Sequence, residues 1–343
     1  MKIAVRADAS PGLGLGHAKR CVSLAQALRD RGAEVRFFSR DMGLDPHTWT
    51  DPAGFGVQVM DIEARSDAFA DALHFVASAA RFEPEWVIVD HYGLGADWHD
   101  AVRDRLGCRL AAIDDLGDRP MHAHLLVDPN LSADPEGKHS AGLRNGTRLL
   151  SGPAHALLAP AYAQARRHVP RGQVQSIGIF MGGTDAADLS RLAWHATRDL
   201  AGFGGRIEIA TTHGNPNLPA LQARVAGDPL TTITLDQPDL SAFYARHDLQ
   251  IGAGGGATWE RCCIGAPTLA LLAASNQYPV LLPLQSLGVM VLVDADPPDA
   301  HDLVAPLQRL LADASMRRDL SERARRLVDG LGAQRVAQIM ETS

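Results

Sequence analysis

Short apolar runs alternate with amphipathic stretches along the whole chain. Apolar runs that end near glycine, aspartate or proline are typical of buried strands, and apolar residues that recur every three or four positions are typical of helices. The runs predict strands at Lys2–Arg6, Glu34–Ser39, Trp86–Val89, Leu110–Ile113, Leu125–Val127, Ser176–Met181, Arg206–Ala210, Thr231–Leu235, Leu249–Ile251 and Thr268–Leu272.

Helical periodicity marks several of the segments between these strands. In the segment that starts at His17, Val22, Leu24 and Leu28 share one helical face, and Gly32 suits the end of the helix. Strands that alternate with helices form βαβ units, in which the sheet is parallel. Further helices are predicted at Asp185–Asp199, at Ala257–Ile264 and over most of the region from Ala300 to Ile339.

Two polar, turn-rich stretches interrupt this alternation midway. One extends from Asp128 to about Leu150, and the other from Arg166 to Gly172. Together with the length of 343 residues, they predict two domains, at residues 1–160 and 161–343. The predicted fold class is α/β, with two Rossmann-like doubly wound domains facing a cleft. The last helix belongs to the second domain or packs back on the first.

Composition excludes several functional classes. The net charge is -7, and no run of lysine or arginine stands out, which argues against binding to nucleic acid and against electrostatic docking on membranes. The first apolar run is too short for a signal peptide, and no stretch reaches the roughly 18 apolar residues of a membrane span. The four cysteines lack CxxC spacing, so we expect a cytoplasmic protein without disulfides or zinc.

The first candidate for chemistry is the glycine-rich turn between the first strand and the first helix. It reads Gly12-Leu13-Gly14-Leu15-Gly16-His17, and glycines let a backbone turn tightly and approach a ligand. The spacing differs from the GxGxxG of a dinucleotide site. A helix N-terminus disfavours a protonated imidazole, so His17 is expected to be neutral, the form that a general base needs. The alternative is a plain strand-to-helix turn.

Two further glycine turns lie in the second half of the chain. Gly254–Gly256 open a helix, where backbone N–H groups can bind phosphate. Thr258 can add a hydroxyl donor, and Glu260 can accept from ribose hydroxyls. Gly183-Thr184 repeats the pattern after another predicted strand. The alternatives are that Thr258 caps the helix and that Asp185 starts the helix after Thr184.

Polar side chains also follow other predicted strands. Tyr92 follows the strand that ends at Asp90, and open α/β sheets bind ligands at the carboxyl ends of their strands. Tyr92 can donate to a sugar hydroxyl, or it can shield the strand end. The amides of Asn276 and Gln277 suit a polar, neutral ligand, although Asn276 can also cap a helix.

Two patterns resemble metal ligands and are discounted. His122 and His124 share a strand face without a third ligand nearby in the sequence, and Asp294-Ala295-Asp296 is expected to be a solvated loop. The chain has no Walker A, HExxH or GxSxG motif. The sequence therefore predicts no metal site.

In their order along the chain, these motifs resemble a known family. The residues that carry the resemblance are Gly14-Leu15-Gly16-His17 with Arg20, Asp90-His91-Tyr92, Ile113-Asp114-Asp115, and Gly254–Glu260 through Gly265 to Asn276-Gln277. They resemble the UDP-sugar hydrolase family of the pseudaminic acid pathway, which removes UDP from UDP-2,4-diacetamido-2,4,6-trideoxy-β-L-altropyranose. The resemblance covers most of the chain, and the family is similar to GT-B glycosyltransferases of the MurG type.

The resemblance implies a GT-B fold and a UDP-sugar hydrolase. Because UDP leaves as a stabilised anion, one neutral base and backbone N–H groups are enough, so we expect a metal-independent reaction without cofactors, and water attacking opposite the leaving group inverts the anomeric centre. The resemblance also implies that His17 is the catalytic base, that Tyr92 and Asn276 lie at the sugar and that Glu260 lies at the ribose. The expected partner is a small UDP-sugar, and we expect a monomer. The remaining residues predicted to bind substrate are Gly14, Gly16, Arg20, Gly183, Thr184, Gly254, Gly255, Gly256, Thr258 and Gln277.

The chain departs from the family pattern after Gln277. The resemblance implies a charged, alanine-rich helix there, but the sequence has Pro279 and Pro283. Three other functions stay open. A GT-B transferase would use the same UDP site with a sugar or lipid acceptor. A Rossmann oxidoreductase would use the first glycine turn and leave the second unexplained. A nucleotide-sugar sensor would bind without turnover.

Overall fold

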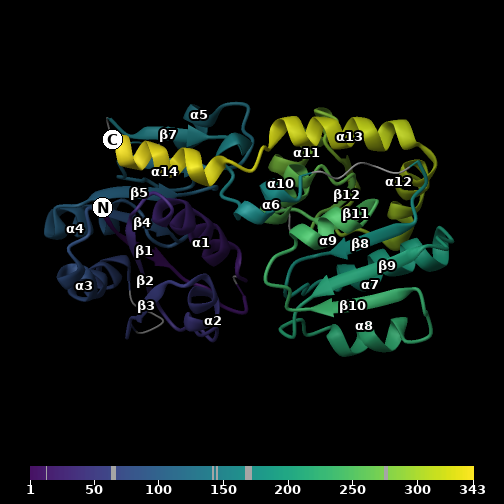
Figure 1. Ribbon diagram of the computed structural model, residues 1–343, viewed down its shortest axis with the longest axis horizontal. Coiled ribbons are helices and arrows are strands. Elements are labelled where there is room, and N and C mark those ends of the chain that lie inside the picture. The colour runs from purple at the N-terminus through teal and green to yellow at the C-terminus, as the bar shows by residue number, and fades with distance from the viewer. Residues whose placement is uncertain (13, 63–66, 141–142, 144–145, 167–171, 274–276) are drawn as a thin grey trace. The chain divides into compact units, whose positions relative to one another are not determined.

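The computed structural model describes residues 1–12, 14–62, 67–140, 143, 146–166, 172–273 and 277–343 (Figure 1). The chain forms two compact units. Unit 1 comprises Met1–Ala159 and Gly330–Ser343, and unit 2 comprises Pro160–Asp329.

The centre of unit 1 is a seven-stranded parallel sheet with the order β3-β2-β1-β4-β5-β6-β7. Its central strands are almost wholly buried, because helices cover both faces. The strands are β1 (Lys2–Ala7), β2 (Glu34–Ser39), β3 (Gly56–Val59), β4 (Trp86–Asp90), β5 (Arg109–Ile113), β6 (Leu125–Asp128) and β7 (Arg148–Ser151).

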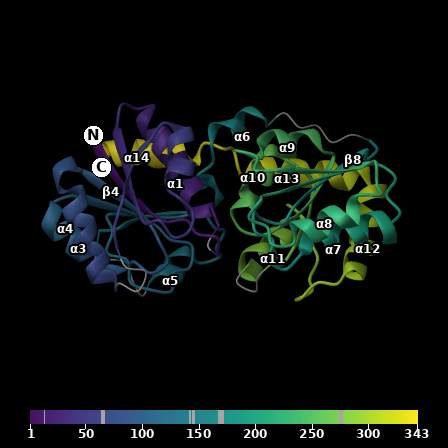
Figure 2. The ribbon, with the colours of Figure 1, turned by 90° about the horizontal axis from the view of Figure 1, so that it is seen from below.

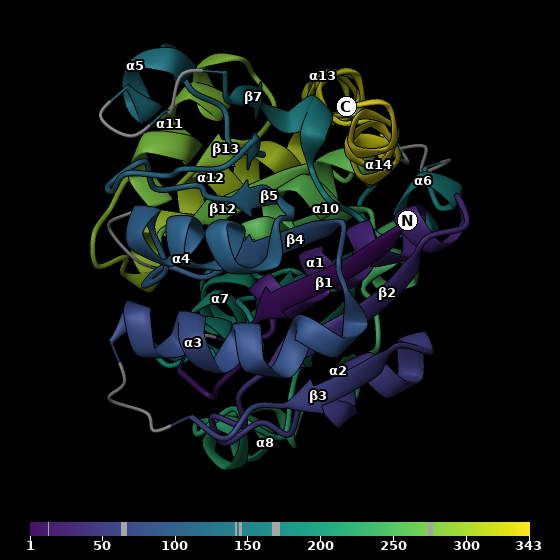
Figure 3. The same cartoon turned by 90° about the vertical axis from the view of Figure 1, so that its left-hand side faces the viewer.

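Alternate side chains of β1 enter two different cores. Ile3 and Val5 pack with α1, whereas Ala4 packs with α3 and α4, which lie side by side over one face of the sheet (Figure 3). The helices and short turns of unit 1 are α1 (Gly16–Arg29), α2 (His47–Thr50), η1 (Asp51–Ala53), α3 (Ala68–Ala79), η2 (Ala80–Phe82), α4 (Ala96–Leu106), α5 (Pro135–His139), η3 (Pro153–His155) and α14 (Gly332–Thr342).

The C-terminal helix α14 belongs to unit 1, although unit 2 precedes it in the sequence. It lies beside α1 (Figure 2), and Ala333, Val336, Ala337 and Met340 are buried in the core that α1 shares with the sheet. At the far end of α14, Glu341 forms an ion pair with Arg31. The chain therefore passes from unit 1 to unit 2 and back again.

Unit 2 has a six-stranded parallel sheet with the order β10-β9-β8-β11-β12-β13. The strands are β8 (Ser176–Phe180), β9 (Arg206–Thr211), β10 (Thr231–Leu235), β11 (Leu249–Ala253), β12 (Thr268–Leu271) and β13 (Val291–Leu292). The helices are α6 (Pro160–Gln164), α7 (Leu189–His195), η4 (Ala196–Leu200), α8 (Leu218–Val225), α9 (Ser241–Arg246), α10 (Gly256–Ile264), α11 (Tyr278–Ser286), α12 (Ala300–Ala312) and α13 (Ala314–Leu327). The predicted α/β fold with two doubly wound sheets is confirmed.

Two helices bear on the sequence-based expectations. The predicted helix Asp185–Asp199 is wrong at its start, because Asp185 and Asp188 have positive φ values of 37° and 56°. The Asp185 carboxylate instead accepts from the N–H groups of Leu189 and Ser190. It therefore caps the first turn of α7, although Asp185 itself precedes the helix. Helix α11 contains both prolines: Pro279 lies in the first turn, where a helix makes no use of the N–H group, and Pro283 lies inside the helix.

All four cysteines are buried and unpaired, as expected of small core side chains. Within the described ranges, no helix combines the length and the apolar character that crossing a membrane requires.

Candidate functional site

The predicted site residues lie at one particular place in each sheet. In unit 1 the strand order reverses between β1 and β4, and in unit 2 it reverses between β8 and β11. Doubly wound sheets bind ligands outside the carboxyl ends of such strand pairs. His17 follows β1 and Tyr92 follows β4, while Gly183 follows β8 and Gly254–Gly256 follow β11. The structure therefore brings the predicted loops together in pairs.

The turn after β1 leads into α1 and leaves the first residue of this helix exposed. Gly14 has a φ of 72° and its N–H donates to the Ser10 carbonyl at 2.8 Å, which closes the turn. Gly16, the first residue of α1, is exposed, and no described side chain caps the helix. The first N–H groups of this helix therefore have no partner inside it. His17 is the second residue and is only 8% exposed.

Asp90 fixes the His17 ring. The His17 Nδ1 atom lies 2.6 Å from Asp90 Oδ1. The Arg20 guanidinium, one turn later, contacts both oxygens of Asp90 at 2.5 and 2.6 Å. Burial alone would raise the pKa of Asp90, but Arg20 and then His17 outweigh it and hold this pKa well below its usual range. An ionised carboxylate only accepts, so Nδ1 carries the hydrogen of this contact, and in the tautomer with one ring hydrogen the lone pair lies on Nε2. Arg20 Nη2 lies 3.2 Å from the same Nδ1, farther than Asp90.

Tyr92 and Asp115 complete this arrangement, which we call the His17 cluster: His17, Arg20, Asp90, Tyr92 and Asp115. The rings of His17 and Tyr92 meet edge to face, with centroids 4.5 Å apart. Arg20 also contacts Asp115 at 3.0 Å, so it joins the ends of β4 and β5. Burial and the neighbouring Asp115 carboxylate raise the pKa of Tyr92, which keeps the phenol protonated as a donor.

A second set of buried charges supports the loop that carries Tyr92. Asp8 accepts from Arg6 at 2.5 and 2.9 Å and from the backbone and side chain of Arg40 at 2.8 Å. His91 lies 3.6 Å from Asp8, and its Nδ1 accepts from the Gly93 N–H. Burial and the positive charge of Arg6 lower the pKa of His91 to about 4. His91 is therefore neutral near pH 7.

In unit 2, the glycine loop before α10 is open at its tip. Gly255 has a φ of 81°, and Gly255 and Gly256 are exposed. Of the described side chains, none caps α10. The N–H of Gly254 donates to Gln277 Oε1 at 3.2 Å, and the Ala273 N–H donates to the same oxygen at 3.1 Å. Gln277 therefore holds the loop in place, while its tip at Gly255 and Gly256 stays exposed.

The other predicted residues of unit 2 have varied surroundings. Thr258 is 1% exposed, and its hydroxyl faces Arg261 at 3.4 Å, in the interior. Glu260 lies beside the phenols of Tyr162 and Tyr244, whose pKa values rise through burial and then through this carboxylate. Further predicted residues are the half-buried Thr184, Gly183, whose carbonyl accepts from Thr212 at 2.8 Å, and Asn276, which lies outside the described residues.

Comparison with known proteins adds sequence relatives. No family model matches the chain. The spore coat polysaccharide biosynthesis protein SpsG of Bacillus subtilis is 21% identical over 345 aligned residues, which cover 99% of this chain and 98% of that protein. The UDP-2,4-diacetamido-2,4,6-trideoxy-β-L-altropyranose hydrolase of Campylobacter jejuni is 27% identical over 223 residues, or 65% of this chain and 73% of the hydrolase. The resemblance predicted from the motifs is confirmed.

Solved structures match over the full length. MurG of Acinetobacter baumannii superposes with a TM-score of 0.70 at 14% identity, covering 100% of both chains. The glycosyltransferase SsfS6 of Streptomyces sp. SF2575, solved with thymidine diphosphate, gives 0.65 at 16% identity, also over 100% of both chains. The chain has the GT-B fold.

Two residues of this GT-B protein were not assigned a role from the sequence. Asp90 and Asp115 were noted as parts of motifs, but their partners depend on the order of strands. Only in a sheet where β4 lies next to β1 does Asp90 meet His17, which is 73 residues earlier in the chain. For Asp90 the usable signal was its place directly after a buried apolar run, whereas Asp115 is the second residue after such a run.

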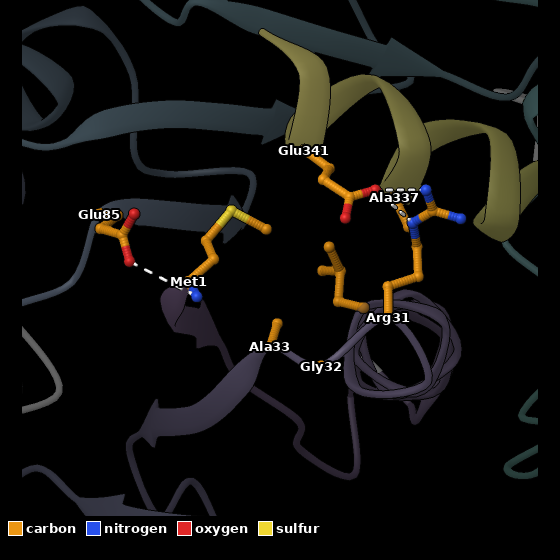
Figure 4. A pocket seen from close by; sticks show the side chains of 8 residues that line it. Met1, Arg31, Gly32, Ala33, Glu85, Ala337 and Glu341 are labelled. Atoms are coloured by element: carbon orange, nitrogen blue, oxygen red, sulfur yellow. Dashed lines mark hydrogen bonds and ion pairs between the residues drawn. The ribbon is translucent and has the colours of Figure 1, made fainter.

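A pocket at the other end of the unit 1 sheet, where the strands begin, does not belong to the site (Figure 4). It has a volume of about 260 Å³ and lies near the residues that precede β1, β2 and β4. Its charged groups already pair with one another: Met1 with Glu85, and Arg31 with Glu341. The amino ends of parallel strands are not where GT-B and other doubly wound folds bind ligands.

Proposed function

We propose that the protein is a metal-independent hydrolase that removes UDP from a UDP-linked diacetamido-trideoxy sugar, as in pseudaminic acid biosynthesis. The observation that carries the proposal is the His17–Asp90 contact of 2.6 Å at the reversal point of unit 1. This contact leaves Nε2 free to take a proton from water. The likeness to the Campylobacter jejuni hydrolase supports the choice of substrate.

The chemistry needs one base and a place for negative charge. UDP leaves as a stabilised diphosphate anion, so the leaving group needs no proton. His17 Nε2 accepts a proton from water as the water attacks the anomeric carbon, and the sugar C–O bond breaks with inversion. Backbone N–H groups at the exposed glycines of α10 receive the developing charge on the diphosphate. Asp90 stabilises the imidazolium that forms.

We assign the other predicted residues around this reaction. Tyr92 and Asn276 contact the sugar, and Gln277 holds the glycine loop. Glu260 contacts the ribose. The remaining assignments follow from the loops that carry them: Gly14, Gly16 and Arg20 support the base, and Gly183, Thr184, Gly254, Gly255, Gly256 and Thr258 form and support the diphosphate site.

A second candidate function is transfer of the sugar to a sugar or lipid acceptor. The likeness to the glycosyltransferase SsfS6 favours it, because both chains share one fold over their full lengths. The His17 cluster would serve either reaction, since a base can deprotonate an acceptor hydroxyl as well as water.

A panel of UDP-sugars, incubated without acceptor and with excess EDTA, tests the proposal. We expect UDP and free sugar in equal amounts from a diacetamido-trideoxy substrate. We expect EDTA to have no effect, because the described residues include no group of three or more His, Cys, Asp or Glu able to hold a metal. Release of UDP only when an acceptor is added would favour transfer. Loss of activity in EDTA that magnesium or manganese restores would contradict metal independence.

The glycine loop gives a prediction about UDP binding. A Cβ added at Gly256 meets no atom within 4 Å, and its φ is not in the left-handed region, so Gly256→Ala should fold normally. The methyl group would occupy space that the diphosphate needs, so calorimetric titration should show UDP affinity lower by roughly tenfold or more. Gly255→Val should also weaken UDP binding, but its φ of 81° adds backbone strain.

Two matched variants control this measurement. Gly227→Ala adds the same methyl group in open space elsewhere in unit 2 and should leave UDP affinity unchanged. Tyr92→Phe should also keep UDP affinity, because Tyr92 is assigned to the sugar. The division of roles would be wrong if Tyr92→Phe lost UDP binding while Gly256→Ala kept it.

A further inference from the structure

A buried arginine lies under the glycine loop of unit 2. Arg261 belongs to α10 and is 1% exposed. Its Nη2 atom donates to the Ala253 carbonyl at 2.7 Å, at the last residue of β11. The guanidinium rests on Gly252, where a Cβ would lie 2.5 Å from Nη1. A side chain at position 252 would therefore clash with Arg261.

Among the residues that the structure describes, two nitrogen atoms of Arg261 lack a hydrogen-bond partner: its buried Nε and Nη1 atoms. Arg261 lies beside the phenol of Tyr244, which the Glu260 carboxylate also influences, and within the described part of the chain it forms no direct ion pair of the kind that Arg6 forms. The contrast within the molecule is Arg6, equally buried, which pairs with both Asp8 and Asp71. A guanidinium stays protonated in proteins, and leaving its buried N–H groups without acceptors is costly. Such an arrangement requires an explanation beyond packing.

We propose that Arg261 is the positioning residue of the diphosphate site. The inference rests on the proposed function. It goes further, because it assigns the anion selectivity of the loop to a buried residue beneath it. Arg261 acts in two ways. Its hydrogen bond turns the Ala253 carbonyl inward, so the loop presents N–H groups rather than carbonyl oxygens to the ligand. Its charge adds to the positive end of the α10 dipole, and a bound anion compensates for it.

Arg261→Gln and Arg261→Lys separate the two effects. Glutamine keeps a donor for the Ala253 carbonyl and removes the charge, whereas lysine keeps the charge. Calorimetric titration with UDP and with uridine gives a ratio of affinities that does not depend on the folded fraction. We expect Arg261→Gln to weaken UDP by about tenfold or more and to leave uridine unchanged. Arg261→Lys should keep most of the UDP affinity.

Arg317→Gln is the matched control. Arg317 is fully buried in the same unit, and its guanidinium also donates to backbone carbonyls, at Leu310 and Gly172. We expect this variant to lower the thermal unfolding temperature and to keep the UDP to uridine ratio. If Arg261 acted in folding alone, Arg261→Gln would leave the ratio of UDP affinity to uridine affinity unchanged. An unchanged ratio overturns the inference.

The test also separates this inference from the proposed function. A wild-type protein that binds UDP but hydrolyses no UDP-sugar would overturn the hydrolase and leave the role of Arg261 standing. If wild-type protein does not bind UDP, inorganic pyrophosphate is the probe, and Arg261→Gln should weaken it by a similar factor. A wild-type protein that binds neither anion overturns both proposals.

Discussion

Replacing His17 with alanine is expected to lower the turnover of the UDP-sugar by about a hundredfold or more. The variant loses the only atom assigned to take a proton from water, His17 Nε2. UDP affinity should stay the same, because the diphosphate is assigned to the loops of unit 2. Steady-state kinetics and calorimetric titration of UDP measure the two quantities separately.

His122→Ala is the control for this variant. His122 belongs to unit 1 and contacts Asp100 through Nδ1 at 2.8 Å, so it forms a similar histidine–aspartate pair. It precedes β6, away from the carboxyl ends of the strands. This substitution should leave turnover unchanged. Near-normal turnover of His17→Ala would show that another group is the base.

Replacing Asp90 with asparagine is expected to lower turnover by roughly a hundred- to ten-thousandfold. The carboxylate now accepts from His17 Nδ1. An asparagine amide can donate to that nitrogen instead, and the ring then carries its proton on Nε2, the wrong position for a base. The imidazolium would also lose the charge that stabilises it. Single-turnover kinetics on the purified variant would measure the effect on the chemical step.

Asp90 also pairs with Arg20, so the stability of the variant needs its own measurement. Removing one partner from a buried ion pair costs about 3–5 kcal/mol. Thermal unfolding shows whether the variant is folded at the assay temperature, and Asp100→Asn, which disturbs the His122 pair, is the matched control. If folded Asp90→Asn turns over substrate at the wild-type rate, Asp90 does not set the tautomer of His17.

The fold was largely predictable because buried parallel strands carry continuous apolar runs. β2 and β10 have the predicted bounds, Glu34–Ser39 and Thr231–Leu235. β3 (Gly56–Val59) was missed because it is an edge strand whose residues are mostly exposed, so its sequence has no apolar run. β13, with two residues, is too short to leave a pattern.

The site was predictable only in part. Glycine turns before helices are visible in a sequence, since they combine a run of glycines with a following periodic segment. The partners of those turns are not visible, because they lie at the ends of other strands. The contacts of Arg20 with Asp90 and Asp115 join residues separated by 70 and 95 positions, and they follow from the order β1-β4-β5.

The position of α14 determines the order in which the protein is completed during synthesis. Unit 2 is an insertion within unit 1, and its last residue is Asp329. The core of unit 1 includes Val336 and Met340, which are synthesised after all of unit 2. Domains usually fold as they emerge, with the N-terminal one first. In this protein, unit 2 has all of its residues first, and the unit that carries His17 keeps an uncovered apolar face beside α1 until α14 has been synthesised.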